Sequence, residues 1–514
     1  MSQATVLFQN VSFMYDTASV PLFVNLQLHF PVGWSGIIGA NGCGKTTLLQ
    51  LAVGKLQPQQ GQVQSLAEAV YCPQRTDEPP PFFDALLDAT DGSARRLKGQ
   101  LEVAESWRGR WHTLSHGERK RAQIGVAVWR RPQILAIDEP TNHLDATARD
   151  LLITALRSFQ GVGLLVSHDR TLLDTLCQQC VFIDPPQAVL RPGGFSQGSR
   201  QAKAEARRAD KQYAHAKRER QRIEREAHRR RADAAQAHHK RSKRGLAKKD
   251  HDARGQKNLA RATGKDGVGG KLLRQLDARL DRARHTQASI SVTKTSALGI
   301  WMPGMQSKRA TLFSLPACRL PLGPERWLHV PSLTMRPDDR IALTGANGSG
   351  KSTLIARLIK SVDLPPERVT YIPQEIPRRQ AEASVSQTRS LAKDKRGQLM
   401  TIISRLGSQP QRLLETGQPS PGEVRKLLLA LGMLHTPQLI VMDEPTNHLD
   451  VPSIECLEAA LQDCPCGLLL VSHDEYFLSR LTKTRWQIRR QDEQSSHADM
   501  TLRIVDVDTP RAIG

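Results

Sequence analysis

Three short sequences occur twice in this chain of 514 residues, in the same order and at a nearly constant separation. GANGCGKTT, which begins at Gly39, returns as GANGSGKST after 306 residues. IDEPTNHLD from Ile137 and LLVSHD from Leu164 each return after 305 residues, the former with Met as its first residue. Chance matches would not keep this register, so the chain contains a duplicated domain. We refer to the copies as the first and second domain.

Each domain has the pattern of an α/β fold. An apolar run precedes each glycine-rich loop and an amphipathic segment follows it, which predicts strand, loop and helix. Further apolar runs, such as residues 134–137 and 439–442, end in polar residues and predict buried parallel strands. Since ligands bind at the carboxyl ends of such strands, the repeated motifs are expected to form sites there.

The first repeat fits GxxxxGK[ST] between a predicted strand and a predicted helix. This pattern is typical of a nucleotide phosphate site, because glycines let backbone N–H groups surround the phosphates while the lysine reaches the β- and γ-phosphates. We call it the phosphate loop. Its candidate nucleotide-binding residues are Gly39, Asn41, Gly42, Gly44, Lys45, Thr46 and Thr47 in the first domain, and Gly345, Asn347, Gly348, Gly350, Lys351, Ser352 and Thr353 in the second.

An aspartate ends the apolar run of each second repeat, and a glutamate follows it directly. The aspartate and the phosphate-loop hydroxyl can supply oxygen ligands to Mg²⁺. The glutamates Glu139 and Glu444 can orient or deprotonate the water that attacks the γ-phosphate, although a surface glutamate without such a role is the alternative. The candidate metal ligands are Thr46 and Asp138 in the first domain, and Ser352 and Asp443 in the second.

The sequence between these motifs resembles the signature of the ATP-binding cassette superfamily: LSHGERKRAQIGVAV from Leu114 and PSPGEVRKLLLA from Pro419. The resemblance implies two cassettes that pair head to tail within a monomer, each ATP lying between one phosphate loop and the other signature. The residues it implies at the ATP are Ser115, Gly117, Glu118, Ser420, Gly422 and Glu423 of the signatures, the glutamine-loop residues Gln74 and Gln374 as further metal ligands, and the switch histidines His168 and His473 as catalytic residues.

The chain as a whole resembles the ABC-F family of ribosome-associated ATPases. The resemblance rests on two cassettes, the lack of an apolar run long enough to cross a membrane, a charged linker, and EPTNHLD in both domains. This resemblance implies ATP hydrolysis with Mg²⁺, a cytoplasmic location, and ribosomal RNA and tRNA as partners. Two alternatives stay open, namely the ATPase subunit of a membrane transporter and a DNA-binding ATPase. Some family members carry an arm before the first signature. Gln74 and Ser115 are only 41 residues apart, which predicts no arm.

The net charge of +22 is concentrated in residues 200–284, which hold 28 Lys and Arg against 11 Asp and Glu. We predict the first cassette over 1–196, a basic helical hairpin over 197–292, the second cassette over 293–490 and a polar tail over 491–514. Leu272, Leu273, Leu276 and Leu280 share one helical face and are expected to pack against the other helix.

The excess of positive charge in the hairpin favours a polyanion, and its one aromatic residue, Tyr213, argues for contact with phosphates rather than base stacking. A solvated hairpin that merely spaces the cassettes is the alternative. The candidate RNA-binding residues at its tip are Arg241, Lys243, Arg244, Lys248 and Lys249.

Two departures from the family pattern predict that the ATP sites are unequal. Tyr15 matches the aromatic residue that stacks on adenine in the family, whereas residues 317–322 of the second domain contain no aromatic residue. The second signature also carries Pro419 and Pro421 where Leu and Gly are usual.

Overall fold

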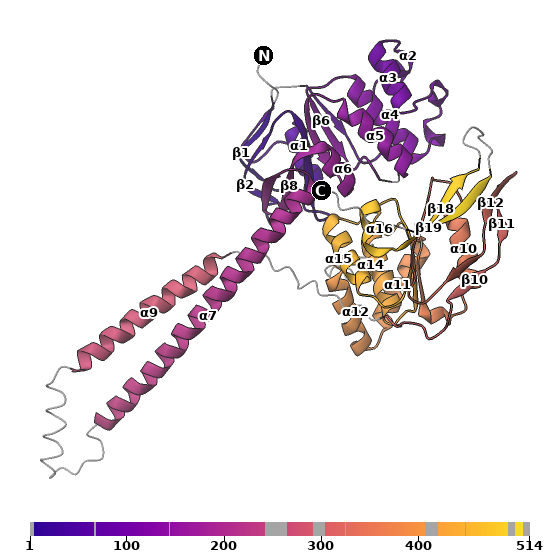
Figure 1. Cartoon of the computed structure of the whole chain (residues 1–514). Coiled ribbons are helices and arrows are strands. Elements are labelled where there is room, and N and C mark those ends of the chain that lie inside the picture. Colours follow the sequence, from indigo (N-terminus) through magenta and orange to yellow (C-terminus); the bar gives the residue numbers. More distant parts are fainter. Residues whose placement is uncertain are drawn as a thin grey trace, which may run out of the picture. The chain divides into compact units, whose positions relative to one another are not determined.

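The computed structural model describes residues 5–65, 68–142, 144–241, 265–290, 304–323, 325–406, 420–447, 449–491 and 499–506 (Figure 1). The chain forms two compact units. One unit combines Met1–Gly198 with Ser296–Gly514 and contains both α/β domains, and the other is the linker, Ser199–Thr295. None of the described helices is both long enough and apolar enough to cross a membrane.

The first domain is built on two sheets. Its six-stranded sheet has the order β5-β6-β7-β3-β8-β9 and is parallel except at β9, while a three-stranded antiparallel sheet has the order β2-β1-β4. The strands are β1 Val6–Phe13, β2 Phe23–Phe30, β3 Gly33–Gly39, β4 Gln60–Ser65, β5 Ala69–Cys72, β6 Ile134–Asp138, β7 Val162–Val166, β8 Cys177–Asp184 and β9 Gln187–Pro192.

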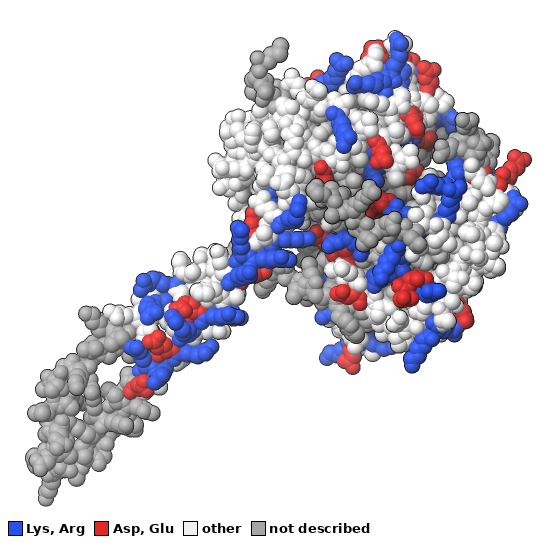
Figure 2. All heavy atoms as spheres, viewed as in Figure 1, with Lys and Arg blue, Asp and Glu red and all other residues white. Residues whose placement is uncertain are grey.

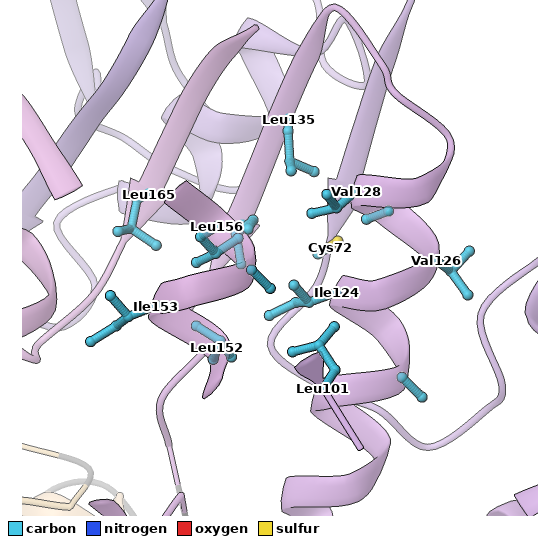
Figure 3. Close-up of a cluster of buried hydrophobic side chains, with 14 of the residues drawn as sticks. Cys72, Leu101, Ile124, Val126, Val128, Leu135, Leu152, Ile153, Leu156 and Leu165 are labelled. Carbon is cyan, nitrogen blue, oxygen red and sulfur yellow. The ribbon is translucent and has the colours of Figure 1, made fainter. Parts of the chain in front are cut away.

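Helices complete two hydrophobic cores in the first domain. One core includes Leu48 and Leu49 of α1 with side chains of β1, β2 and the larger sheet. The other includes Ile124 of α4 and Leu152 and Leu156 of α5, which lie beside one another in Figure 3. The helices are α1 Lys45–Ala52, α2 Phe83–Asp88, α3 Gly92–Gln100, α4 His116–Trp129, α5 Ala146–Arg157 and α6 Arg170–Leu176.

No arm projects between the glutamine loop and the first signature, as the short spacing predicted. The segment forms α2, α3 and two short 3-10 turns, Glu105–Trp107 and Trp111–Thr113. Leu86, Leu97 and Trp107 from this segment are buried in the same core as α4.

The second domain repeats this design with one extended sheet, whose order is β11-β12-β19-β18-β14-β17-β16-β15. A two-stranded ladder, β10 with β13, lies outside it. The strands are β10 Phe313–Leu315, β11 Cys318–Gly323, β12 Arg326–Val330, β13 Leu333–Met335, β14 Arg340–Gly345, β15 Val369–Ile372, β16 Leu439–Asp443, β17 Gly467–Val471, β18 Thr484–Arg490 and β19 Met500–Asp506. The helices are α10 Lys351–Ser361, α11 Arg378–Ser390, α12 Lys393–Arg405, α14 Pro421–Met433, α15 Val451–Gln462 and α16 Glu475–Leu481, with a 3-10 turn at Pro366–Arg368.

The strand β19 corrects the sequence analysis. The sequence predicts a polar tail over 491–514, whereas residues 500–506 pair with β18 and extend the sheet of the second domain. Met500 and Leu502 are buried, whereas Thr501 and residues 503–505 are more exposed. Met500, Leu502 and Ile504 alternate with polar residues, so a strand signal was available in the sequence but was overlooked within a segment that is polar before residue 500.

The linker is a pair of long helices, α7 Phe195–Arg241 and α9 Lys265–Ser289. Leu276 and Leu280 of α9 pack on Ile223 of α7, which confirms the predicted apolar contact at these two positions. Ion pairs between Arg231 and Asp277 and between Arg284 and Glu224 also join the helices. The side chains of Leu272, Leu273 and Arg241, and residues 242–264 with the other four predicted RNA contacts, lie outside the described part.

Candidate active sites

Both phosphate loops end in a glycine that caps the following helix. Gly44 and Gly350 have φ of +98° and +97° and precede α1 and α10 directly. An added Cβ would lie 2.8 Å from the ring of Phe23 at the first position and 2.5 Å from the side chain of Leu322 at the second. Glycine is therefore required by conformation and by space, and each loop presents a helix N-terminus where backbone N–H groups can bind an anion.

The lysine of each phosphate loop folds back over its own loop. Lys45 Nζ donates to the carbonyl oxygens of Gly39 at 2.9 Å and Ala40 at 3.1 Å. Lys351 Nζ donates to those of Gly345 at 2.7 Å and Ala346 at 3.0 Å. These bonds hold each ammonium group beside the N-terminus of the helix, where phosphate charge is expected.

Four of the predicted metal ligands meet as two pairs, while Gln74 and Gln374 line the cavities described below. Thr46 Oγ1 donates to Asp138 Oδ2 over 2.7 Å, and Ser352 Oγ donates to Asp443 Oδ2 over 3.1 Å. Each aspartate is the last residue of a buried strand, β6 or β16, and the hydroxyl comes from the first turn of the helix after the phosphate loop. A carboxylate and a hydroxyl oxygen suit Mg²⁺, so the residues present fit that ion.

The glutamates after these strands are buried beside the switch histidines. Glu139 Oε1 lies 3.1 Å from His168 Nε2, and Glu444 Oε1 lies 3.4 Å from His473 Nε2. Within the described structure both Oε1 atoms are buried without a hydrogen-bond partner of suitable geometry. Each glutamate also has a left-handed φ, +47° and +48°, that is uncommon for this residue type and is typical of functional positions.

Burial sets the charge of these groups in the nucleotide-free protein. It raises the pKa of Glu139 and of Glu444 to about 8, with the adjacent aspartate adding to the rise. Burial and, to a smaller extent, the neighbouring phosphate-loop lysine lower the pKa of His168 to about 3 and of His473 to about 4. Both imidazoles are therefore neutral near pH 7, and each can offer one N–H donor and one acceptor.

Two cavities each combine a phosphate loop of one domain with the signature of the other. A cavity of about 980 Å³ is lined by residues 347–348 and 350–353, Gln374, Glu444 and His473 of the second domain and by Ser115, Gly117 and Glu118 of the first. A cavity of about 530 Å³ is lined by Tyr15, Asn41, Gly42, residues 44–47, Gln74, Asp138, Glu139 and His168 of the first domain and by Ser420, Pro421 and Gly422 of the second.

Each signature glutamate accepts hydrogen bonds from the signature serine of its own domain. Glu118 Oε2 accepts from the backbone N of Ser115 at 2.7 Å and from its Oγ at 2.8 Å, and Glu423 does the same for Ser420 at 2.9 and 3.0 Å. Both pairs form capping boxes at the N-termini of α4 and α14. Glu118 also lines the larger cavity, whereas Glu423 does not belong to the lining of the smaller one.

Sequence analysis missed a pair of aspartates that cross between the domains. Asp450 Oδ2 accepts from the backbone N of Asn41 at 2.6 Å, and Asp145 Oδ2 accepts from that of Asn347 at 3.2 Å. Both are the last residue of an EPTNHLD repeat and the N-cap of a helix, α15 or α5. The repeat itself was the available signal, but only the structure shows that its last residue reaches the opposite phosphate loop.

The two cavities differ beside the phosphate loops. In the first domain β1 and β2 are joined by residues 14–22, and Tyr15 OH shares a hydrogen bond of 2.7 Å with Thr47 Oγ1. In the second domain β11 and β12 form a tight hairpin, and Leu322 lines the larger cavity. The second domain thus lacks an aromatic residue near 317–322, as expected, and it also lacks a counterpart of the loop that carries Tyr15 in the first domain.

Comparisons with known proteins also find two similar domains in this chain. The family described as ABC transporter matches residues 24–142 and 328–447. The "Ribosome protection protein VmlR" of Bacillus subtilis is 26% identical over 88% of this chain and 80% of its own length. The "Tylosin resistance ATP-binding protein TlrC" of Streptomyces fradiae is 29% identical over 92% of this chain and 95% of its own length. An archaeal ribosome recycling factor, aABCE1, solved with the stalk protein aP1, has a similar fold, with a TM-score of 0.60 at 17% identity over 96% of this chain and 89% of its own.

Proposed function

Because the chain belongs to the ABC-F family of tandem ATP-binding cassette ATPases, we propose that it hydrolyses ATP at two composite sites and uses this cycle to act on the ribosome in the cytoplasm. The observation that carries the proposal is that each of the two cavities is lined by the phosphate loop of one domain and the signature of the other. A cavity of this kind closes around a ligand only when both domains contact it, so binding can be coupled to domain closure.

In this proposal the protein groups at each site have distinct tasks. The phosphate-loop N–H groups and lysine bind the phosphates, and the signature serine approaches from the other domain. The hydroxyl–aspartate pairs hold Mg²⁺, which when bound neutralises charge on the β- and γ-phosphates. Oε1 of Glu139 or Glu444, which has no hydrogen-bond partner in the described structure, accepts a hydrogen bond from the attacking water. The backbone N–H of His168 donates to Oε2 of Glu139 at 3.3 Å and so holds that carboxyl group in place.

The charge of the linker favours a polyanionic partner. Within residues 200–233 and 275–290, whose side chains are described, there are 16 Lys and Arg against 8 Asp and Glu. Even if every acid is paired, as several are with arginines, half of the cations remain for an external anion. Figure 2 shows these basic side chains along the described part of the linker. We propose the ribosome as this polyanion because VmlR is named a ribosome protection protein and aABCE1 a ribosome recycling factor.

Co-sedimentation with ribosomes tests this function. The Glu139→Gln/Glu444→Gln chain with ATP is expected to sediment with ribosomes, with an affinity that falls as salt rises. Neutralising the tip residues to Gln should weaken binding and flatten the salt dependence by about 0.7 to 0.9 in slope for each phosphate that the hairpin no longer neutralises. The tip residues are Arg241, Lys243, Arg244, Lys248 and Lys249.

A matched control removes five exposed cations from α11 and α12 of the second domain and should leave ribosome binding unchanged. When the same substitutions are made in the chain with Glu139 and Glu444 intact, partner-free ATP turnover should survive in both variants, because the residues assigned to ATP binding and hydrolysis are unchanged. Unaltered affinity and salt slope in the tip variant would make the hairpin a spacer, and capture of DNA or a membrane protein instead of ribosomes would contradict the proposal. The control residues are Arg378, Arg379, Arg389, Lys393 and Lys395.

A further inference from the structure

Two buried cations occupy equivalent places in the two domains. Lys120 lies on α4, five residues after Ser115, and Arg425 lies on α14, five residues after Ser420. They are only 4% and 5% exposed. A buried charge is costly unless its donors are satisfied, and here backbone carbonyl groups satisfy them.

The carbonyl partners of Lys120 belong to the smaller cavity. Lys120 Nζ donates to the carbonyl oxygens of Pro73 at 2.8 Å, Gln74 at 3.4 Å and Asp138 at 3.3 Å. Gln74 and Asp138 line that cavity beside the first phosphate loop. The helix that carries Lys120, however, begins at Ser115, which lines the larger cavity beside the second phosphate loop. Lys120 thus joins elements of both sites.

Arg425 makes the reciprocal connection. Its Nη1 donates to the carbonyl oxygens of Glu444 and Asn447, both at 2.7 Å, and its Nη2 donates to that of Gln374. All three residues line the larger cavity. Its helix begins at Ser420, which lines the smaller cavity. The two cations therefore cross-link the two sites in opposite directions.

In each domain, one rigid helical segment separates the signature serine from the buried cation. Five residues of α-helix span about 7.5 Å, and the hydrogen-bonded turns between them contain no joint that could absorb a displacement. A shift of the signature when it meets the γ-phosphate must then move the cation and the carbonyl groups that it holds. Stability alone gives little reason for this arrangement, because a buried cation is often no more stabilising than a well-packed apolar residue.

We propose that Lys120 and Arg425 are positioning residues that couple the two ATP sites, so that ATP bound at one site raises the affinity of the other. The inference rests on the proposed function in that it takes both cavities as ATP sites. Lys120 transmits occupation of the larger cavity to Gln74 and Asp138, and Arg425 transmits occupation of the smaller cavity to Gln374 and Glu444.

Equilibrium binding in the hydrolysis-deficient chain measures this coupling. In the Glu139→Gln/Glu444→Gln chain, calorimetric titration with Mg-ATP gives the affinity of the first phosphate loop when the second is competent. The same titration with Lys351→Ala added gives that affinity when the second site stays empty. We expect the affinity of the first phosphate loop to be on the order of 5- to 150-fold higher when the second site is competent than when it stays empty, which is the usual range of allosteric coupling. Because coupling between two binding sites is reciprocal, Arg425 still carries part of it when Lys120 alone is replaced. Lys120→Met and Lys120→Gln should therefore lower the ratio, and Lys120→Met combined with Arg425→Met should bring it to within about twofold of unity. Lys120→Arg should keep most of the coupling.

Arg119 provides a matched control on the same helix. Its Nε donates to the carbonyl oxygen of Trp111 at 2.9 Å and its Nη2 to that of His112 at 2.8 Å, and neither residue lines a cavity. Arg119→Met should therefore keep the coupling. A ratio unchanged by folded Lys120→Met or Lys120→Gln, or lost equally in Arg119→Met, would overturn the inference. Two bound ATP with no coupling in the parent would also overturn it, whereas absence of ATP binding would instead overturn the proposed function.

Discussion

Arg170 of the first domain donates to Glu458 of the second over 2.5 Å, and both side chains are almost completely buried. Asp474 lies 3.1 Å from the same guanidinium nitrogen, and the ring of Tyr476 lies 4.1 Å from the guanidinium carbon. The equivalent position in the second domain is Glu475, which pairs with Arg485 of its own domain. The contact between the domains is thus asymmetric, with a buried ion network around Arg170 that its counterpart Glu475 does not form.

We predict that Arg170→Met destabilises the protein by roughly 1 to 3 kcal/mol, because Asp474 and Oε1 of Glu458 lose their buried partner while Arg480 still pairs with Oε2 of Glu458. Glu475→Gln is the control. Its ion pair is partly exposed, so removing it should cost less than about 1 kcal/mol. Denaturant unfolding of both variants gives the comparison, and equal costs would show that the Arg170 network contributes little to holding the domains together.

The repeated motifs could be placed from the sequence because each needs only local structure. A strand, a glycine turn and a helix bring Lys45 and Thr46 to one point, and parallel strands bring Asp138 to the same edge of the sheet. The predicted pairing of Thr46 with Asp138 and of Ser352 with Asp443 is found in the structure for this reason.

Contacts between distant segments could not be predicted in the same way. Arg170 and Glu458 are 288 residues apart, and no local pattern distinguishes Arg170 from the many other arginines of this basic chain. Lys120 lies within the first signature, among charged residues that suggest a solvated surface, yet it is buried. Its partners are backbone carbonyl groups, which every residue carries, so side-chain chemistry provides no signal for them.

We predict that the two glutamates proposed as catalytic contribute unequally to turnover, so that Glu444→Gln removes more of it than Glu139→Gln. Pro421 lines the smaller cavity at the position where His116 lines the larger one. Ser420 keeps the same capping box as Ser115, but proline removes the backbone N–H that follows it. The smaller site therefore has one donor fewer for transition-state charge, a deficit that reduces kcat by about 100- to 1,000-fold at comparable sites.

Steady-state ATPase assays of the two single variants measure this difference. Pro421→His in the Glu444→Gln chain should recover turnover, because it restores the missing N–H at the smaller site. Equal residual activities of the two glutamine variants, or no effect of Pro421→His, would contradict this account of the asymmetry. The double glutamine variant provides the baseline.

The last prediction concerns Tyr15, which is 43% exposed at the mouth of the smaller cavity. Its hydroxyl shares a hydrogen bond with Thr47, and its ring meets that of Phe13 edge to face at 5.0 Å, so the ring is already held in place before a base arrives. Stacking of a base on an aromatic ring is worth about 1 to 3 kcal/mol. We therefore expect Tyr15→Leu to weaken ATP binding at this site by roughly 5- to 150-fold.

Calorimetry in the Lys351→Ala chain isolates this site, and ribose triphosphate without a base should bind wild type and Tyr15→Leu equally. Tyr15→Phe separates the ring from the hydroxyl and should keep most of the affinity. Leu322→Ala, tested in the Lys45→Ala chain, is the matched change at the larger cavity and should alter ATP affinity by less than about threefold, since an aliphatic side chain offers no π-face. If Tyr15→Leu binds ATP as well as wild type, Tyr15 serves the position of Thr47 and not the base.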